Sequence, residues 1–211
     1  MPTVRKAALA HLREYVDLTT ALGCEYLVVH CGFHFSAYLP TVRAALYETM
    51  ARCVEYGERR RVPLVIENMN PLPGDSEFQY LGVTVEEFRA LFARIRSPYL
   101  GLALDVAHSE LLPGGSVPFV RAFGQRIHSA QLSDNRRRVD EHMAIGDGKI
   151  DFRRVLGALE GIGFTGPLII ELFDVPKKLR SHRRLLALLA QAGGKRSVRA
   201  KARRARRPGG S

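Results

Sequence analysis

The sequence predicts an α/β fold in which parallel strands form a barrel, and three observations predict it. Short apolar runs alternate with segments of helical period along the chain. The polar residues that end successive runs are mostly 37 to 40 residues apart, with 37 from His30 to Glu67, 38 from Glu67 to Asp105 and 40 from Gln131 to Glu171, and a shorter interval of 26 from Asp105 to Gln131. The larger aliphatic residues of these runs fall on one side of each strand. Such alternation favours a parallel sheet, because each return to a parallel strand needs a crossover helix.

Five apolar runs are the expected strands. In chain order they are "LVVHCG" (27–32), "VPLVIENMN" (62–70), "LGLALDVAH" (100–108), "IHSAQLSDN" (127–135) and "GPLIIELFD" (166–174). Each run delivers polar side chains at its carboxyl end, namely His30, Glu67, Asp105, Gln131 with Asp134, and Glu171. The carboxyl ends of barrel strands converge on one mouth, where active sites lie. We therefore expect these polar side chains to lie together.

Three segments between the runs have an apolar stripe with helical period: residues 4–23, 84–95 and 151–164. Gly23 suits the end of the first helix. Thr84 and Glu87 have the spacing of a capping box, and Asp151 is suited to cap the third helix. The sequence therefore predicts helices in the places where crossover connections are needed.

Side-chain alternation favours a barrel over an open doubly wound sheet. Successive strand residues point to opposite faces. If the terminal polar residue points inward, the inward set is mostly small: Val28, Val65, Gly101, Ala103, Ile127, Ser129 and Ile169. The outward set is larger: Leu27, Val29, Leu64, Ile66, Leu102, Leu104, Leu168 and Ile170. This asymmetry suits a (β/α)8 (TIM) barrel with a crowded interior. The same alternation places His128 on the helix-facing side, in a structural role.

The composition indicates one soluble domain. The chain has 211 residues, of which 46% are hydrophobic and 25% charged, enough for one sizeable core. It contains no membrane-length apolar stretch and no signal peptide, so we expect a cytoplasmic protein without a membrane partner. Its three cysteines form no CxxC pair, which argues against a disulfide framework and a zinc knuckle.

The net charge of +11 comes from the end of the chain. Residues 175–211 hold 13 Lys and Arg and no acidic residue, whereas residues 1–174 hold 19 basic and 21 acidic residues, a balance of −2. We therefore predict a partial barrel domain over residues 1–191 and a disordered basic tail over residues 192–211. Contact with nucleic acid is expected only through this tail.

The polar residues at the strand ends predict a metal site. Several carboxylates and imidazoles that converge at one mouth need a cation or bound protons. Oxygen-rich ligation with histidine suits a divalent ion: Mn²⁺, Mg²⁺, Co²⁺ or Zn²⁺. His108 follows Asp105 by three residues, and Asp140 and His142 precede the "GDG" turn. Each pair is ordinary alone, but together with the glutamates they indicate a metal centre.

The ordered motifs "VVHCG", "VIENMN", "LALDVAH", "QLSDN", "DEHMAIGDGKIDF" and "LIIELF" resemble the xylose isomerase-like TIM barrel superfamily over about residues 5–190. This superfamily contains sugar and sugar phosphate isomerases and epimerases, inosose dehydratases, and the abasic-site nucleases of the endonuclease IV group (AP endonuclease family 2). The resemblance implies a divalent-metal-dependent isomerase or epimerase of a sugar, sugar phosphate or related polyol. Alternatives are an abasic-site nuclease and a truncated, inactive member.

The resemblance also implies roles for individual residues. Metal ligands would be Glu67, Asp105, Gln131 and Glu171. Glu67 and Glu171 would also be the catalytic acid/base pair, which moves a proton next to a metal-bound carbonyl. His30, His108 and His142 would contact a carbohydrate substrate. In the nuclease alternative, a zinc cluster would add His30, His108, Asp140 and His142.

The chain departs from the family pattern in two ways. Gln131 stands where the family usually has histidine, and an amide oxygen is a harder ligand, so we predict weakened or altered metal binding, especially of Zn²⁺. By the resemblance, the chain comprises about five βα units and lacks the first three strands. We expect a wrongly chosen start, a gene fragment, or completion by another chain, which could include a homo-oligomer.

Overall fold

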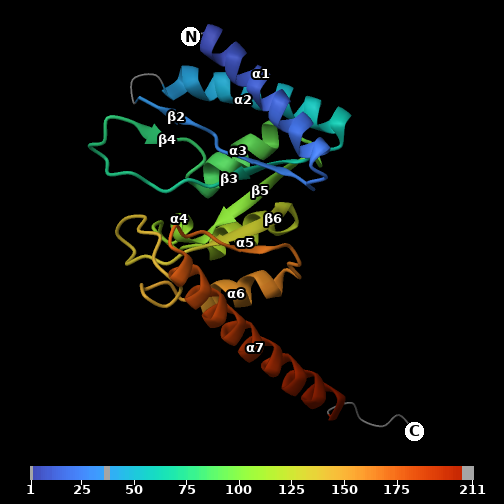
Figure 1. The fold of residues 1–211 in the computed structure, drawn as a ribbon, viewed down its shortest axis with the longest axis vertical. Coiled ribbons are helices and arrows are strands. Elements are labelled where there is room, and N and C mark those ends of the chain that lie inside the picture. The colour runs from blue at the N-terminus through green and yellow to red at the C-terminus, as the bar shows by residue number, and fades with distance from the viewer. Residues whose placement is uncertain (1, 36–38, 206–211) are drawn as a thin grey trace.

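A parallel sheet of five strands forms the centre of the fold (Figure 1). The computed structural model describes residues 2–35 and 39–205, with side chains for 5–35 and 39–191. The strands are β1 (Leu27–Val29), β3 (Leu64–Glu67), β5 (Leu100–Asp105), β6 (Ile127–Leu132) and β7 (Leu168–Ile170). They pair in the order β1-β3-β5-β6-β7, which is also their order along the chain. This is the half-barrel sheet of an incomplete TIM barrel, as predicted.

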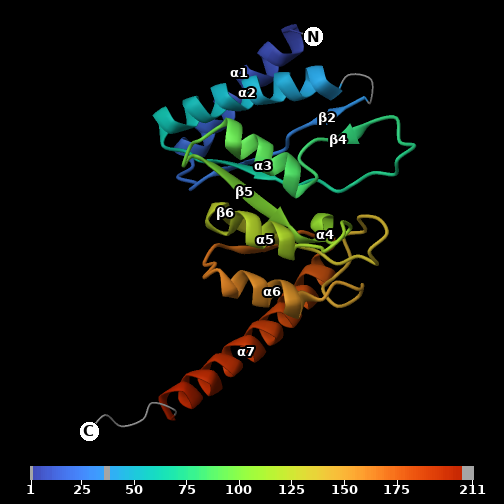
Figure 2. The same ribbon diagram turned by 180° about the vertical axis from the view of Figure 1, so that it is seen from behind.

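Helices connect and cover the strands. They are α1 (Pro2–Ala21), α2 (Leu39–Arg60), α3 (Val85–Arg94), α4 (Val106–Ser109), α5 (Val117–Phe123), α6 (Phe152–Gly161) and α7 (Val175–Ala205), with a 3-10 turn at Gly124–Arg126. Figure 2 shows α3, α5 and α6 along one face of the sheet. The cap of α3 is the predicted capping box of Thr84 and Glu87, and Asp151 caps α6.

The core lies between the sheet and these helices. Leu64, Ile66, Leu102 and Leu104 are fully buried in it, together with Phe88 of α3. Burial of aliphatic and aromatic side chains is the main stabilising contribution to such a layer. The predicted outward set is therefore confirmed, because its other members, Leu27, Val29, Leu168 and Ile170, pack against the same core.

Strand β6 departs from simple alternation, and two predicted orientations are wrong. Its pairing with β5 shifts, so that Leu102 pairs with Ile127 but Ala103 pairs with Ser129. Ile127 therefore packs in the helix-facing core. His128 is the extra residue of this β-bulge, and its ring lies over Gly101 of the inner face. A bulge inserts one extra residue in one strand, so side chains before the bulge point to the opposite face from the one that simple alternation predicts.

Two loops extend the carboxyl side of the sheet. Short strands β2 (Phe33–His34) and β4 (Gln79–Tyr80) form an antiparallel pair in the segments that follow β1 and β3. Figure 1 shows the loop before β4 and the loop after β6 on the same side of the molecule. The mouth predicted from the sequence lies on this side, because β1, β3, β5, β6 and β7 all end there.

The backbone of α7 continues to Ala205, past the predicted domain boundary at residue 191. Side chains of 192–205 and all of 206–211 lie outside the described residues, so disorder of the basic tail stays a prediction. Among the described helices, none combines the length and the apolar character that crossing a membrane requires. Cys24, Cys31 and Cys53 are free thiols, of which Cys31 and Cys53 are buried and Cys24 is exposed.

Candidate metal centre

The predicted site residues lie at the carboxyl ends of the strands. Glu67 and Asp105 are the last residues of β3 and β5, and Asp105 pairs with Gln131 of β6. His30 directly follows β1, and Glu171 directly follows β7, where its N–H donates to the Leu132 carbonyl. The parallel register therefore aligns side chains that are far apart in the sequence along one rim.

Glu67 is the centre of the contacts at this rim. Its side chain is buried, and His30 Nε2 lies 3.3 Å from Oε2. Gln131 Nε2 donates to the same oxygen at 2.9 Å. The other oxygen, Oε1, lies 3.7 Å from His108 Nδ1. Glu67 thus joins residues from three other strand ends.

Asp105 is buried completely and held by Asn68 and His108. Its N–H donates to Asn68 Oδ1 at 2.7 Å, and Asn68 Nδ2 donates to the Asp105 carbonyl at 3.0 Å. Its carboxylate accepts from His108 N–H at 2.7 Å and thereby caps α4. The His108 ring also contacts Asn68, since its Nδ1 donates to the Asn68 carbonyl at 2.8 Å. Asn68 was not singled out from the sequence, although it directly follows Glu67 in "VIENMN".

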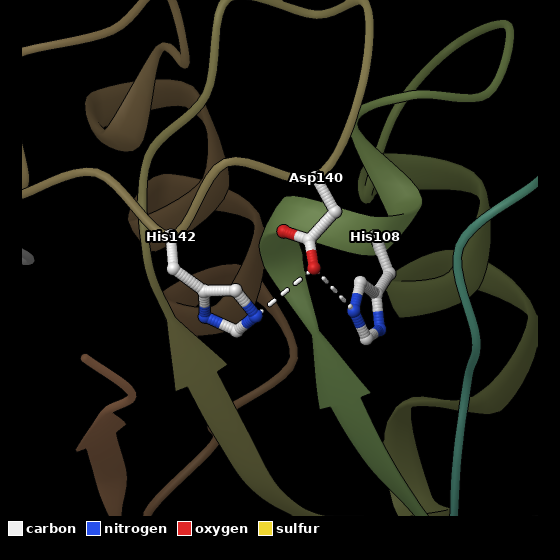
Figure 3. Close-up of side chains that lie close together, drawn as sticks. All are labelled: His108, Asp140 and His142. Atoms are coloured by element: carbon white, nitrogen blue, oxygen red, sulfur yellow. Dashed lines mark ion pairs between the residues drawn. The ribbon is translucent and has the colours of Figure 1, made fainter. Parts of the chain in front are cut away.

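A second cluster shares His108 with the first. Asp140 Oδ2 lies 3.3 Å from His108 Nε2 and 2.9 Å from His142 Nε2 (Figure 3). His142 has a left-handed backbone, with φ of 45°, and its Nδ1 lies 3.3 Å from the Glu171 carbonyl. Ligand atoms of His108, Asp140 and His142 lie within 4.8 Å of one another, as do those of Glu67, Asp105 and His108.

Asp134, also singled out at a strand end, organises the loop instead. It is fully buried, and its carboxylate accepts from the N–H groups of four residues: Asn135, Gly146, Gly148 and Ile150. A side chain at Gly148 would clash with this carboxylate. Residues of the "GDG" turn thus bind the Asp134 carboxylate, and both of its oxygens accept hydrogen bonds from the loop backbone.

The acceptor atoms of the site fit a cation. Within the described residues, the buried oxygens without a hydrogen-bond partner include the hydroxyls of Ser129 and Ser133 and four carboxylate or amide oxygens at this rim: Asp105 Oδ2, Gln131 Oε1, Asp140 Oδ1 and Glu171 Oε2. Buried polar atoms are usually satisfied, because an unpaired one has lost its hydration. All four atoms are acceptors, so a positive ion satisfies them and a second acceptor does not. Three belong to the predicted ligands Asp105, Gln131 and Glu171.

The pKa values of Asp105 and His108 are both raised, but for different reasons. Burial raises the pKa of Asp105 to about 7, and the charges of Glu67 and Glu171 add to this effect. Burial opposes protonation of His108, but Asp140 and Asp105 outweigh it and raise the pKa of His108 to about 9. The hydrogen bond to Glu67 also raises the pKa of His30, so both histidines beside Glu67 are biased toward the protonated form.

The two glutamates have opposite shifts. Burial alone would raise the pKa of Glu67, but hydrogen bonds from His30 and Gln131 hold that pKa below its usual range. Burial and the charge of Glu67 raise the pKa of Glu171. Environments that separate two carboxyl pKa values are typical of acid/base pairs.

Comparison with known proteins gives the family. Residues 2–191 match the sequence model described as xylose isomerase-like TIM barrel. The chain belongs to this family. The resemblance to the xylose isomerase-like TIM barrel family that the motifs indicated is therefore confirmed.

Members of the xylose isomerase-like TIM barrel family similar to this chain include epimerases. The crystal structure of a D-tagatose 3-epimerase-like protein superposes with a TM-score of 0.85 at 28% identity, covering 92% of this chain and 73% of that one. An L-ribulose 3-epimerase of Methylomonas sp. (strain DH-1) is 25% identical over 77% of this chain and 55% of its own length. An uncharacterized protein of Methanocaldococcus jannaschii is 29% identical, covering 84% and 61%. The chain thus spans 61% or less of these curated relatives.

Proposed function

We propose that this protein is a divalent-metal-dependent isomerase or epimerase of a sugar, a sugar phosphate or a related polyol. The observation that carries the proposal is the group of neighbouring ligand atoms of Glu67, Asp105 and His108, beside unpartnered buried oxygens on Asp105, Gln131 and Glu171. Relatives named as D-tagatose 3-epimerase-like protein and L-ribulose 3-epimerase support the reaction class.

Four side chains would hold the ion: Glu67, Asp105, Gln131 and Glu171. When bound, a divalent cation would polarise the substrate carbonyl and stabilise the negative charge that develops beside it. Asp105 contributes a carboxylate that burial keeps poorly solvated, so ionisation is favourable chiefly next to a positive charge.

The glutamates would move the proton. Glu67 has a lowered pKa, so it is ionised at neutral pH and suited to remove the proton from the carbon next to the carbonyl. Glu171 has a raised pKa and can return a proton to the opposite face of that carbon. One proton leaves and one is added, so the product is an epimer and no co-reactant is consumed. Of the three histidines expected to contact the substrate hydroxyl groups, His30 and His142 would do so directly. Both ring nitrogens of the buried His108 have protein partners, so His108 would act through Asp140.

The proposal is tested by metal binding and proton exchange together. Mn²⁺, Mg²⁺, Co²⁺ and Zn²⁺ are added to chelator-treated protein, and ketoses including D-tagatose, D-allulose and L-ribulose are incubated in D₂O. Deuterium should enter at the epimerised carbon. Glu67→Gln and Glu171→Gln should each lower this rate by about 100-fold or more, whereas Glu86→Gln, on the exposed side of α3, should not. The proposal fails if no sugar exchanges and Glu67→Gln leaves the metal content unchanged.

The second cluster favours one alternative. His108, Asp140 and His142 offer a further set of ligand atoms, which one catalytic ion does not use. Two or more metals close together suit phosphodiester hydrolysis, so an abasic-site nuclease is the second candidate. Zn²⁺-dependent cleavage of abasic DNA that is lost in Asp140→Asn, with no ketose exchange, would favour it over the epimerase.

A further inference from the structure

We propose that Glu110, a residue outside the candidate metal centre, is a positioning residue that clamps the segment 137–142 over His108 through Arg137. This inference rests on the proposed function for its catalytic meaning. The clamp is a side-chain arrangement between the end of α4 and the loop after β6, two regions that both carry site residues.

The segment 137–142 needs an external tie. It carries Asp140 and His142 but has no helix or strand of its own, and the bridge between Asp134 and Met143 comes directly after it. Glu141 contacts Arg136 across the segment, at the surface of the loop. Arg137 itself has a left-handed backbone, with φ of 63°, which is uncommon for a residue other than glycine. Such a conformation persists only where surrounding contacts hold it.

Asn135 Oδ1 accepts from the Arg137 N–H at 2.8 Å, and Glu110 holds the Arg137 guanidinium from a buried position. Only 3% of its side chain is exposed, and Oε2 lies 3.2 Å from Arg137 Nη2. Its other oxygen accepts from the N–H and the hydroxyl of Ser116 at 2.9 and 3.0 Å. Arg137 is the one cation paired with this carboxylate within the described residues. Loss of Arg137 would therefore leave a buried charge without a counter-charge.

The surrounding backbone leaves room for this carboxylate. Gly115 has φ of 67°, and a Cβ built on it would clash with both Glu110 oxygens. Ser116 Oγ lies 2.8 Å from Ser109 Oγ, which donates to the Asp105 carbonyl at 2.9 Å. A continuous chain of polar contacts thus runs from the backbone of Asp105 to Arg137.

The salt bridge between Glu110 and Arg137 affects the orientation of the His108 ring through Asp140. Its ring is held at Nδ1 by the Asn68 carbonyl and at Nε2 by Asp140. The first partner belongs to the strand end, but the second belongs to the clamped segment. If Glu110 releases Arg137, Asp140 is still contacted by His142, which lies against the Glu171 carbonyl, but the chain before it loses its buried anchor. The contact of Asp140 with His108 Nε2 then becomes less ordered.

The experiment measures the segment directly, so that it does not depend on catalysis. Amide hydrogen exchange of residues 138–143 and the imidazole ¹⁵N signals of His108 and His142 are compared in the full chain. Glu110→Gln keeps an acceptor for Ser116 but removes the charge that faces Arg137, and Arg137→Gln removes the other partner. Each should speed exchange by about tenfold or more, the change that corresponds to about 1.4 kcal/mol, and should shift the His108 signals.

Three comparisons separate a clamp from general destabilisation. The double variant should exchange no faster than the faster single variant, because partners in one contact are not additive. Arg137→Lys should restore slow exchange, since only one guanidinium contact is made. Arg138→Gln, which removes an exposed positive charge in the same loop, should behave as wild type.

The clamp is refuted if the two single effects add, or if Glu110→Gln leaves the exchange rates and the His108 signals unchanged. Mn²⁺ affinity, measured in parallel, keeps this failure distinct from failure of the proposed function. A wild-type protein that binds no metal but shows the predicted exchange pattern would overturn the metal centre and support the clamp. Unchanged exchange with tight Mn²⁺ binding would do the reverse.

Discussion

Replacement of Asp105 by asparagine should stabilise the metal-free protein at neutral pH. The carboxyl group is completely buried, and its pKa is raised from 3.8 to about 7, chiefly by burial. The difference corresponds to about 4 kcal/mol of unfolding free energy, because one pKa unit is about 1.4 kcal/mol. Asparagine has nearly the same shape and can still accept from the His108 N–H, so the cap of α4 is kept.

The sign follows from the protons bound in each state. Between about pH 4 and 7 the unfolded chain has lost the Asp105 proton while the folded chain retains it, so stability falls as the pH rises. His108 acts in the same direction, because its raised pKa gives stability that is present below about pH 6.5 and lost as the pH rises through about 9. Asp105 contributes to that shift, so about 4 kcal/mol is an upper bound for the gain in Asp105→Asn.

Urea unfolding in the presence of a chelator, from pH 4 to 8, measures this effect. The variant and wild type should agree near pH 4 and diverge as the pH rises, with the variant more stable. Mn²⁺ should stabilise wild type and leave Asp105→Asn unchanged. Asp151→Asn, at the exposed cap of α6, is the matched control and should follow wild type. Parallel pH profiles of wild type and Asp105→Asn would refute the reasoning.

Three further changes test other parts of the structure. Gln131→His should raise Zn²⁺ affinity relative to Mg²⁺ by about tenfold or more, measured by competition with a chromophoric chelator, because imidazole is a softer ligand than an amide oxygen; an unchanged ratio would remove Gln131 from the ligand set. Gly115→Ala should cost about 1–3 kcal/mol in urea unfolding, since the residue has a positive φ and faces Glu110; wild-type stability would contradict the described turn. Phe88→Ala should cost about 3–5 kcal/mol, because this side chain is fully buried between sheet and helices, and a loss below about 1 kcal/mol would show that the core differs.

Local patterns predicted the five strands of the sheet and three of the helices, α1, α3 and α6, and they identified most of the polar residues at the rim but not Asn68. The capping box of Thr84 and Glu87 depends on residues three positions apart, so the sequence alone determines it. Alternation along a regular strand does the same for Leu64 and Ile66. The polar ends of the runs identified residues that lie at one edge of the sheet, because parallel strands present their carboxyl ends there. Asp134 is the exception, since its carboxylate binds the loop instead.

Tertiary structure decided what depends on pairing and on loop paths. The bulge in β6 reversed the predicted orientation of His128, because register is set between strands and not within one. The contact of Asp140 with His108 spans 32 residues of sequence, and Glu110 meets Arg137 across 27. No local periodicity encodes such contacts, since they depend on how a loop returns across the rim. The sequence by itself determined which residues are available to the site, and only the packing of strands and loops decided which atoms they present to one another.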